Sequence, residues 1–391
     1  MNENLKQIPA QVAVITCHNY DAVNVTPAVQ KGLECLGGIS AFVKPGEKIL
    51  LKPNMLAASA PEKAVTFHPA VFKAVAELCL DYGIKLSYGD SPGIGKPWRT
   101  AARCGIMQVA EDLGIPLADF VNPVQVSFPG ALLLKQLHLA AGAVQADGMI
   151  SMSKMKTHAL TRLTGAIKNQ FGCVPGFLKG EFHVKMPDII RFSQVLVDIT
   201  RFLRPRLYIM DGIRAMSGNG PRGGDVFPMN VLLFSADPAA LDAVFCKLID
   251  INPEWVPTMK IAQESGLGTY QWQEIEIVGD DILSHIRPDF PVKRCPVKQS
   301  KSLGPLPSQL KHFLSPRPII DRHLCKQCGD CILQCPVSPK ALIWPDLKTK
   351  KTPIYRYSLC IRCYCCQEIC PAHAISVRFP LLGRLVHRLI D

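Results

Sequence analysis

The C-terminal part of the chain contains eight cysteines in two runs with the same spacing. The first run is Cys-x2-Cys-x2-Cys-x3-Cys-Pro from Cys325 to Pro336, and the second repeats it from Cys360 to Pro371. Three thiols at three-residue steps can wrap a loop around one corner of a metal–sulfur cube. The fourth thiol, followed by proline, points away from its own loop. This spacing requires the two runs to lie side by side in the fold.

The pattern predicts two [4Fe–4S] clusters whose ligands are exchanged between the runs. We expect one cluster to be held by Cys325, Cys328, Cys331 and Cys370, and the other by Cys360, Cys363, Cys366 and Cys335. Soft thiolates select iron–sulfur clusters over hard cations. The alternatives are a disulfide framework or zinc sites, but zinc usually takes paired Cys-x2-Cys or Cys/His units. Residues 319–377 resemble the bacterial two-cluster ferredoxin family. Cys365 is interpreted as an additional buried thiol, and a shifted ligand register is the alternative.

The length and the termini limit the class of protein. A chain of 391 residues is too long for one ordinary domain. The sequence contains no apolar run long enough to span a bilayer, and its start lacks the basic region and long apolar core of a signal peptide. Cluster ligands must stay reduced, so we expect a cytoplasmic location.

The formal charge of +12 raises the question of an acidic partner. Lys and Arg are spread along the chain without an aromatic-interleaved basic motif, so nucleic-acid binding is not expected. Residues 321–377 carry eight Lys/Arg and four Asp/Glu, and each oxidised cluster with four thiolates would add a charge of about −2. Part of the positive charge of this segment would therefore balance the negative charge of the two clusters. A basic surface could also recruit an acidic redox partner protein.

Apolar segments of two periodicities alternate over the first 290 residues. Strands are predicted at residues 11–16, 48–52, 85–88, 148–152, 206–210 and 230–235. Helices are predicted after the first strand, with Pro27 near the helix start, and at residues 68–82, 100–113, 187–202 and 238–249. This alternation favours an α/β domain with a largely parallel sheet and helices on both faces.

Composition divides the chain into four segments. The α/β domain is assigned to residues 1–290, a Pro/Lys-rich linker to 291–318, a small α+β two-cluster domain to 319–377 and a tail to 378–391. The tail carries an apolar stripe between basic residues, which could bind a membrane surface. A stripe of about three turns more often packs on its own domain, so we do not expect membrane binding.

Polar residues follow several predicted strands, where ligands of parallel sheets bind. The catalytic candidates are His158, Asp90 and Lys156, and the substrate-binding candidates are Asn54, Lys154, Lys168, Asn169 and Asp211. Cationic side chains near glycine-rich backbone suit an anionic ligand such as a carboxylate or phosphate. His158 could transfer a proton near neutral pH. The alternative interpretation is a set of helix caps, turn residues and a solvated basic loop.

Two glycine motifs do not fit nucleotide sites. Gly218 to Gly223 matches GxGxxG, but the strand before it is distant and the segment after it is extended. Gly93-Ile-Gly95-Lys96 resembles a phosphate loop, but Asp90 stands at the first glycine position and Pro97 replaces Ser/Thr. NAD and ATP sites of these types are therefore excluded.

Residues 1–290 resemble the DUF362 domain family, which has no secure general function. The motifs that carry the resemblance are KPN at 52–54, GDSPG at 89–93, KMKTH at 154–158, GAIKNQFGCVPG at 165–176, DGI at 211–213, GNGP at 218–221 and ADPAALDA at 236–243. Members of the family often carry a ferredoxin-like module. The resemblance implies that these loops form one functional face, and it names no substrate.

These observations lead to two main hypotheses of different classes. In the first, an iron–sulfur reductase passes electrons from the clusters to an anionic substrate or cofactor in the α/β domain. In the second, the chain is a non-catalytic electron carrier or cluster-delivery module that docks a partner. Redox sensing, in which the cluster state alters docking, is a third possibility.

Overall fold

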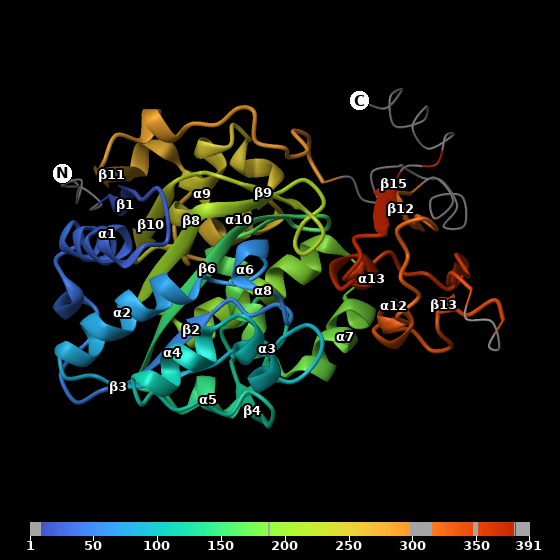
Figure 1. The fold of residues 1–391 in the computed structure, drawn as a ribbon, viewed down its shortest axis with the longest axis horizontal. Coiled ribbons are helices and arrows are strands. Elements are labelled where there is room, and N and C mark those ends of the chain that lie inside the picture. Colours follow the sequence, from blue (N-terminus) through green and yellow to red (C-terminus); the bar gives the residue numbers. More distant parts are fainter. Residues whose placement is uncertain (1–8, 187, 298–314, 347–350, 379, 381–391) are drawn as a thin grey trace, which may run out of the picture.

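The computed structural model describes residues 9–186, 188–297, 315–346, 351–378 and 380. They form a large α/β domain and a small cysteine-rich domain at one side of it (Figure 1). Within these ranges, no helix combines the length and the apolarity needed to cross a bilayer. The tail predicted at 378–391 lies almost wholly outside the described residues, as does the linker between 298 and 314.

One large sheet forms the centre of the α/β domain. Its strand order is β11-β1-β10-β8-β6-β2-β3, with β7 added to β6 and β9 to β8. The pairs β2–β3, β2–β6, β6–β8 and β1–β11 are parallel, whereas β10 is antiparallel to both β1 and β8. The strands are β1 (Ala10–Thr16), β2 (Lys48–Pro53), β3 (Lys85–Tyr88), β6 (Gly148–His158), β7 (Arg162–Thr164), β8 (Leu207–Ser217), β9 (Asp225–Phe227), β10 (Val231–Ser235) and β11 (Ile275–Gly279).

Helices cover both faces of this sheet, as the α/β prediction requires. Because strand side chains alternate, Ile49 and Leu51 face one core while Leu50 faces another. The first face is covered by α1 (Ala22–Glu34), α2 (Pro69–Asp81), α3 (Pro97–Arg103) and α4 (Ile106–Asp112). The other face is covered by α8 (Ile189–Leu203), α9 (Pro238–Leu248) and α10 (Pro257–Glu264). The predicted fold class is confirmed.

Shorter elements complete the domain. A hairpin pairs β4 with β5. The remaining elements are β4 (Pro123–Ser127), β5 (Gln136–Ala140), α5 (Ala141–Val144), α6 (Ala166–Asn169), α7 (Gly176–Lys185), and the 3-10 turns η1 (Ile39–Ala41), η2 (Pro61–Lys63), η3 (Gln170–Cys173), η4 (Pro253–Trp255), η5 (Trp272–Glu274) and η6 (Ile282–His285).

Several predicted boundaries were wrong. The single helix expected at 100–113 is two helices, because Gly105 adopts a left-handed φ of 77° between them. The first helix begins at Ala22, so Pro27 lies inside it rather than near its start. Strands β6 and β8 continue to His158 and Ser217, well beyond the predicted ends. Polar residues on these extensions are buried, and hydropathy alone does not mark them as strand.

The cysteine-rich domain repeats one local structure twice. Its two helices, α12 (Asp330–Leu333) and α13 (Cys365–Glu368), each contain the third cysteine of a run. Gly329 and Tyr364 precede these helices with left-handed φ angles of 83° and 62°. Two residues earlier, Gln327 and Arg362 also take left-handed φ angles, of 56° and 60°, at the same position of each run. Antiparallel pairs complete the domain: β12 (Arg317–Ile320) with β15 (Ile375–Arg378), and β13 (Leu342–Ile343) with β14 (Ile354–Tyr355).

A buried carboxyl on α9 anchors α6 and predicts a pH effect. Asp242 accepts hydrogen bonds from the backbone N–H groups of Ala166 (2.6 Å) and Ile167 (3.2 Å), and burial raises its pKa from 3.8 to about 7. The native state therefore binds more protons than the unfolded state between these values. This group should make the free energy of unfolding fall as the pH rises from about 4 to 7, by on the order of 1–4 kcal/mol.

Asp242→Asn should remove this part of the pH slope in chemical unfolding of the full chain. Asp81→Asn makes the same chemical change at an exposed position of α2 and should leave the slope unchanged. Equal slopes for the wild-type protein and Asp242→Asn would contradict the assignment.

Candidate functional site

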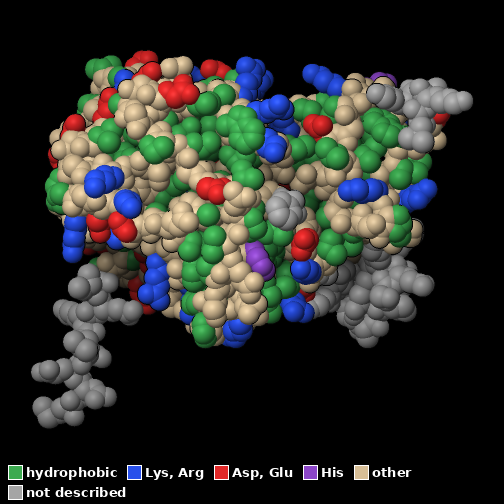
Figure 2. Space-filling view, turned by 90° about the horizontal axis from the view of Figure 1, so that it is seen from below, with side chains coloured by type: hydrophobic (Ala, Val, Ile, Leu, Met, Phe, Trp, Pro, Cys, Tyr) green, Lys and Arg blue, Asp and Glu red, His purple; other side chains and the backbone are tan. Residues whose placement is uncertain are grey.

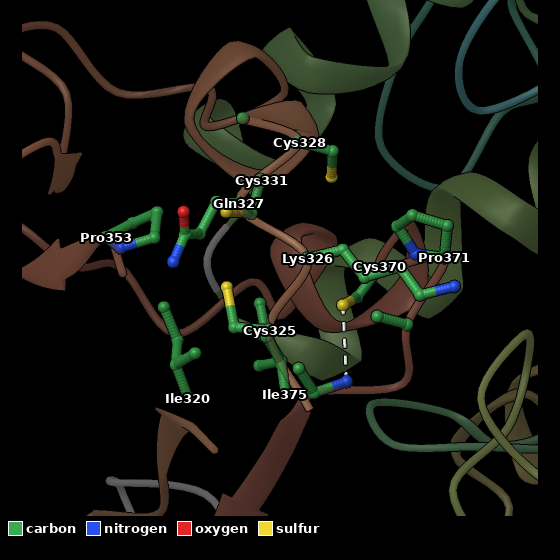
Figure 3. A pocket seen from close by; sticks show the side chains of 13 residues that line it. Ile320, Cys325, Lys326, Gln327, Cys328, Cys331, Pro353, Cys370, Pro371 and Ile375 are labelled. Carbon is green, nitrogen blue, oxygen red and sulfur yellow. Dashed lines mark hydrogen bonds between the residues drawn. The ribbon is translucent and has the colours of Figure 1, made fainter. Parts of the chain in front are cut away.

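Two cavities in the cysteine-rich domain are each lined by four of the eight cysteines. The first has an empty volume of about 340 Å³, including space open to solvent, and its lining includes Cys325, Cys328, Cys331 and Cys370 (Figure 3). The second, of about 320 Å³, has Cys360, Cys363, Cys366 and Cys335 in its lining. Each cavity is thus lined by three cysteines of one run and the last cysteine of the other. These are the two sets that the spacing predicts.

Other features of the cavities suit a bound metal–sulfur cluster. The backbone N–H of Ala374 donates to Cys370 Sγ (3.3 Å), and Tyr355 Oη lies 3.2 Å from Cys366 Sγ. Hydrogen bonds to cluster sulfurs are one way that proteins set reduction potentials. Left-handed φ angles at the non-glycine residues Gln327, Arg362 and Tyr364 cost about 1–3 kcal/mol each, and such residues concentrate at functional sites. The residues present therefore fit the cluster that the spacing implies.

The cysteine thiols form no disulfide bonds. All sixteen cysteines are free, so no disulfide framework is present. Among the residues that the structure describes, no three His, Cys, Asp or Glu side chains are grouped as ligands of a single metal ion. Cys365 is buried beside the second cavity, but it is not among the residues that line it. Cys365 and Cys363 share a hydrogen bond that raises the pKa of the Cys365 thiol.

The cysteine-rich domain is attached to the α/β domain through α13 and β15. Gln367 Nε2 lies within hydrogen-bond distance of Asn219 Oδ1 (2.8 Å) and of the carbonyl oxygens of Asn219 and Gly220 (3.1 Å each). Asn219 Nδ2 donates to the carbonyl of Ile375 (3.2 Å), and Arg222 donates to the carbonyl of Ile369. The loop of residues 218–223, which matches GxGxxG in sequence, thus packs against the cysteine-rich domain. Gly220 lies so close to β6 that a Cβ there would be 2.3 Å from the Thr157 carbonyl oxygen.

His158 lies at this junction, at the end of β6. Its Nδ1 accepts hydrogen bonds from the backbone N–H groups of Leu160 (3.0 Å) and Thr161 (3.2 Å). The proton of the neutral ring is therefore on Nε2, which lies 2.9 Å from Glu368 Oε1, off the ideal hydrogen-bond angle. Burial, together with the nearby Lys168 charge, lowers the pKa of His158, although Glu368 opposes this. Glu368 is two residues from both Cys366 and Cys370.

Lys154 and Asp211 form a buried ion pair between neighbouring strands. The two residues are paired in the register of β6 and β8, and Lys154 Nζ lies 2.7 Å from Asp211 Oδ2. Tyr20 Oη donates to Asp211 Oδ1 (2.9 Å) and accepts from Lys154 Nζ (2.8 Å). The Tyr20 ring stacks on His68 with centroids 3.5 Å apart. Burial lowers the pKa of Lys154, and the charge of Asp211 opposes this.

A second buried pair joins β2 to the loop after β3. Lys52 Nζ lies 2.8 Å from Asp90 Oδ1 and donates to Asn169 Oδ1 (2.9 Å). Asp90 Oδ2 accepts from the backbone N–H of Met55 (2.6 Å). Gly172 makes this pair possible, because a Cβ there would be 1.8 Å from Asp90 Oδ1. Asp90 and Asn169 are therefore held by Lys52, a residue that the sequence analysis did not select.

Lys156 and Lys168 differ from these paired lysines. Lys156 is fully buried and donates to Asn54 Oδ1 (2.6 Å) and to the carbonyl of Val65 (2.8 Å); within the described chain, no carboxylate forms an ion pair with it. Burial, followed by the charges of Lys168 and Lys154, holds the pKa of Lys156 well below its usual range. Burial also lowers the pKa of Lys168, and the charge of Glu368 opposes this. An added anion would be stabilised here by both lysines.

The predicted site residues thus gather at the carboxyl edge of the sheet, in smaller groups than one open pocket. Asn54 meets Lys156, Asp90 and Asn169 meet Lys52, and Asp211 meets Lys154. His158 and Lys168 face α13 of the cysteine-rich domain. Sequence reasoning missed Tyr20, Lys52, Gln367 and Glu368. Lys52 could have been found, because it belongs to the KPN motif, but no local signal marks the others.

Residues 49–247 match the family described as a domain of unknown function, DUF362. The chain belongs to the DUF362 family. It is 35% identical over 257 residues to a thylakoid-associated protein of Synechocystis sp., which covers 66% of this chain and 79% of that protein. The four groups at the sheet edge lie mostly within the matched DUF362 segment.

Two further similarities are more limited. A stretch of 60 residues, 15% of this DUF362 protein, is 37% identical to an uncharacterized ferredoxin of Methanocaldococcus jannaschii and covers 75% of it. The structure also resembles the lactate racemase apoprotein from Thermoanaerobacterium thermosaccharolyticum, with a TM-score of 0.36 and 11% identity, over 62% of this chain and 58% of that one. A structural similarity of this size carries no argument about function.

The buried Lys154–Asp211 pair of this DUF362 protein predicts a large loss of stability when only one of the two residues is replaced. Lys154→Met leaves Asp211 buried without its cation and should reduce the free energy of unfolding by about 3–5 kcal/mol. Lys154→Met combined with Asp211→Leu should recover most of this loss, because no unpaired charge remains.

Urea unfolding of the full chain measures both effects. The exposed pair Lys260–Glu264 serves as control, and Lys260→Met should cost no more than about 1 kcal/mol. A double variant that is less stable than Lys154→Met would show that the pair is not the source of the cost.

Proposed function

We propose that this protein is an electron-transfer protein with two [4Fe–4S] clusters. The observation that carries the proposal is the lining of the two cavities, each by three cysteines of one run and the fourth of the other. Cys325, Cys328, Cys331 and Cys370 would hold the first cluster, and Cys360, Cys363, Cys366 and Cys335 the second. When bound, each cluster supplies reversible one-electron chemistry. The similarity to an uncharacterized ferredoxin supports this assignment.

We further propose a reductase whose acceptor binds at the carboxyl edge of the sheet, beside the second cluster. The contact between His158 and Glu368 supports this placement, because Glu368 belongs to the helix that carries Cys366. Ligands of parallel α/β sheets bind at this edge. The acceptor would be an anionic small molecule, since Lys156 has no carboxylate partner within the described chain and Lys168 lies nearby.

Each catalytic candidate has a defined task in this proposal. Reduction adds negative charge to the acceptor, and Lys156 and Lys168 would offset it in their protonated form, which a bound anion favours against the effect of burial on their pKa. Reduction also consumes protons, and His158 holds one on Nε2 at the junction. The electrons would come singly from a reduced protein carrier, which is oxidised by one electron for each electron that enters the clusters. Asp90 contacts Lys52, so its role is to position that lysine.

One observation favours a second candidate function. Lys52 and Lys154 are buried and already neutralised by Asp90 and Asp211, so neither is available to a substrate. If Lys156 and Lys168 also serve only packing, the protein is a non-catalytic electron carrier. The two candidates share the clusters and differ in whether the sheet edge binds a ligand.

Paired cysteine substitutions test the crossed ligand sets. Cys335→Ala with Cys360→Ala removes two ligands of the second cluster, so one cluster with about four iron atoms should remain. Cys331→Ala with Cys335→Ala removes one ligand from each cavity, so both clusters should be damaged. Iron analysis and EPR of the reduced, anaerobically prepared protein measure the outcome.

The neighbouring Cys365→Ala is the control and should keep both clusters. If each run held its own cluster, the two double variants would exchange their results. That outcome would contradict the crossed assignment.

Co-purification tests the proposed acceptor site. Mass spectrometry of the anaerobically purified protein should detect an anionic small molecule that Lys156→Ala and His158→Ala variants lose while they keep their iron. Lys260→Ala, on the exposed face of α10, should retain the molecule. The same small molecules in all preparations, or none in any, would favour the non-catalytic carrier.

A further inference from the structure

We propose that the surface around the first cavity is the docking site of an acidic one-electron carrier protein, and that electrons enter through the first cluster. This inference rests on the proposed function, because it requires the clusters. It adds the class of partner, its binding surface and the direction of internal transfer, from the first cavity to the second.

The exposed charges of the cysteine-rich domain are almost all positive. Among its described residues between Arg317 and Arg378, six exposed side chains are Lys or Arg, and Asp321 is the one exposed acid. The exposed cations are Arg322, Lys326, Lys340, Lys351, Arg356 and Arg378. Figure 2 shows Lys and Arg side chains at the end of the molecule where this domain lies. A surface with this balance complements a negatively charged partner.

Lys326 lines the first cavity, and Arg322 and Lys351 are close in sequence to residues that line it; we call these three cations the basic rim. Lys326 is part of the cavity lining, and Lys351 is two residues from Pro353, which also lines it (Figure 3). Arg322 is three residues before Cys325. Three acids oppose these cations: Asp321 is exposed beside Arg322, Asp330 interacts with Arg222, and Asp225 interacts with His373.

The α/β domain adds to the same face. Burial lowers the pKa of His373, and the charges of Arg222, of Lys326 and of Lys63, which is exposed at the end of η2, lower it further. The cations near the first cavity therefore come from two domains that are far apart in sequence. A partner that docked here would contact both domains.

Exposure separates the two cavities. Cys328 of the first cavity is exposed, and Leu324 beside Cys325 is 53% exposed, as an apolar contact for a partner would be. Each cavity has two buried cysteines, but Cys360 and Cys363 of the second cavity are only half-buried rather than exposed. Helix α13, which carries Cys366, is held against Asn219 and His158 of the α/β domain. Among the eight cysteines, Cys328 is the one exposed thiol, so a docked partner would come nearest to a thiol at the first cavity.

The charge on the rim should act mainly on the rate of encounter. Opposite charges steer proteins together and raise association rates by about 10- to 1,000-fold at low ionic strength. Salt removes this effect, since exposed charges are screened over about 8–10 Å near physiological ionic strength. In each productive encounter, the carrier would lose one electron and the first cluster would gain it.

Stopped-flow reduction of the full-length chain with both clusters tests the proposal. The probe is an acidic flavodoxin in its fully reduced state, and the variant carries Arg322→Glu, Lys326→Glu and Lys351→Glu. We expect its second-order rate at low salt to fall about tenfold or more and to lose its dependence on salt. The matched control carries Lys44→Glu, Lys48→Glu and Lys85→Glu. These three lysines are exposed at or near the starts of β2 and β3, at the sheet edge opposite the carboxyl edge, and the rate of this control should stay within about twofold of the wild-type rate.

Each outcome decides between the proposals. Equal rates for the rim variant and the control, or a wild-type rate without salt dependence, would overturn the docking proposal. Rim-dependent binding to mixed phosphatidylcholine and phosphatidylglycerol vesicles, without an effect on flavodoxin, would assign the rim to a membrane surface instead. If the glutamate variant loses iron, the corresponding Gln variant replaces it and should give an intermediate rate.

The state of the clusters separates this inference from the proposed function. EPR after complete photochemical reduction should show both clusters in the wild-type protein, the rim variant and the control. Absence of both signals in the wild-type protein would overturn the proposed function itself. Intact signals with unchanged flavodoxin kinetics would overturn the docking site alone.

Discussion

The exchange of the last cysteine between the two runs is the constraint on which the rest of the account depends. Cys335 joins the cavity of the second run and Cys370 joins that of the first, so neither set of four is complete until both loops have folded together. The left-handed residues at matching places in the two loops follow from this duplicated geometry. Because α13 carries Cys366 and also Gln367 and Glu368, the same helix fixes the position of the cysteine-rich domain on the sheet edge.

Charge is arranged differently in the two domains. Lys52 and Lys154 are buried against carboxylates, and such pairs are costly to break even when they add little net stability. Lys156 is buried against Asn54 without a carboxylate partner in the described chain, and Lys168 interacts with Glu368 of α13. In the cysteine-rich domain, by contrast, the cations of the basic rim are exposed to water. In the proposed electron path, the exposed cations of the basic rim would attract the donor protein, and Lys156 and Lys168 at the sheet edge would bind the acceptor.

The sequence predicts the parts of this structure that depend on local pattern. The α/β class and the large sheet follow from alternating periodicities, and the cysteine spacing predicts which thiols line each cavity. The sequence does not predict the side-chain contacts that form between distant segments of the chain. Glu368 and Gln367 are ordinary polar residues in the sequence, and only the fold brings their side chains to His158 and Asn219 of the α/β domain. Likewise, Lys154 and Asp211 were selected as ligand contacts, but the strand register places them opposite each other as a pair. The predicted cytoplasmic location stays a prediction.

The most direct test of the central claim is the iron and acid-labile sulfide content of the unmodified full-length protein after anaerobic purification. The account predicts about eight iron and eight sulfide per chain, with little zinc. Zinc in place of iron, without labile sulfide, would contradict it, as would a saturated content of about four iron per chain.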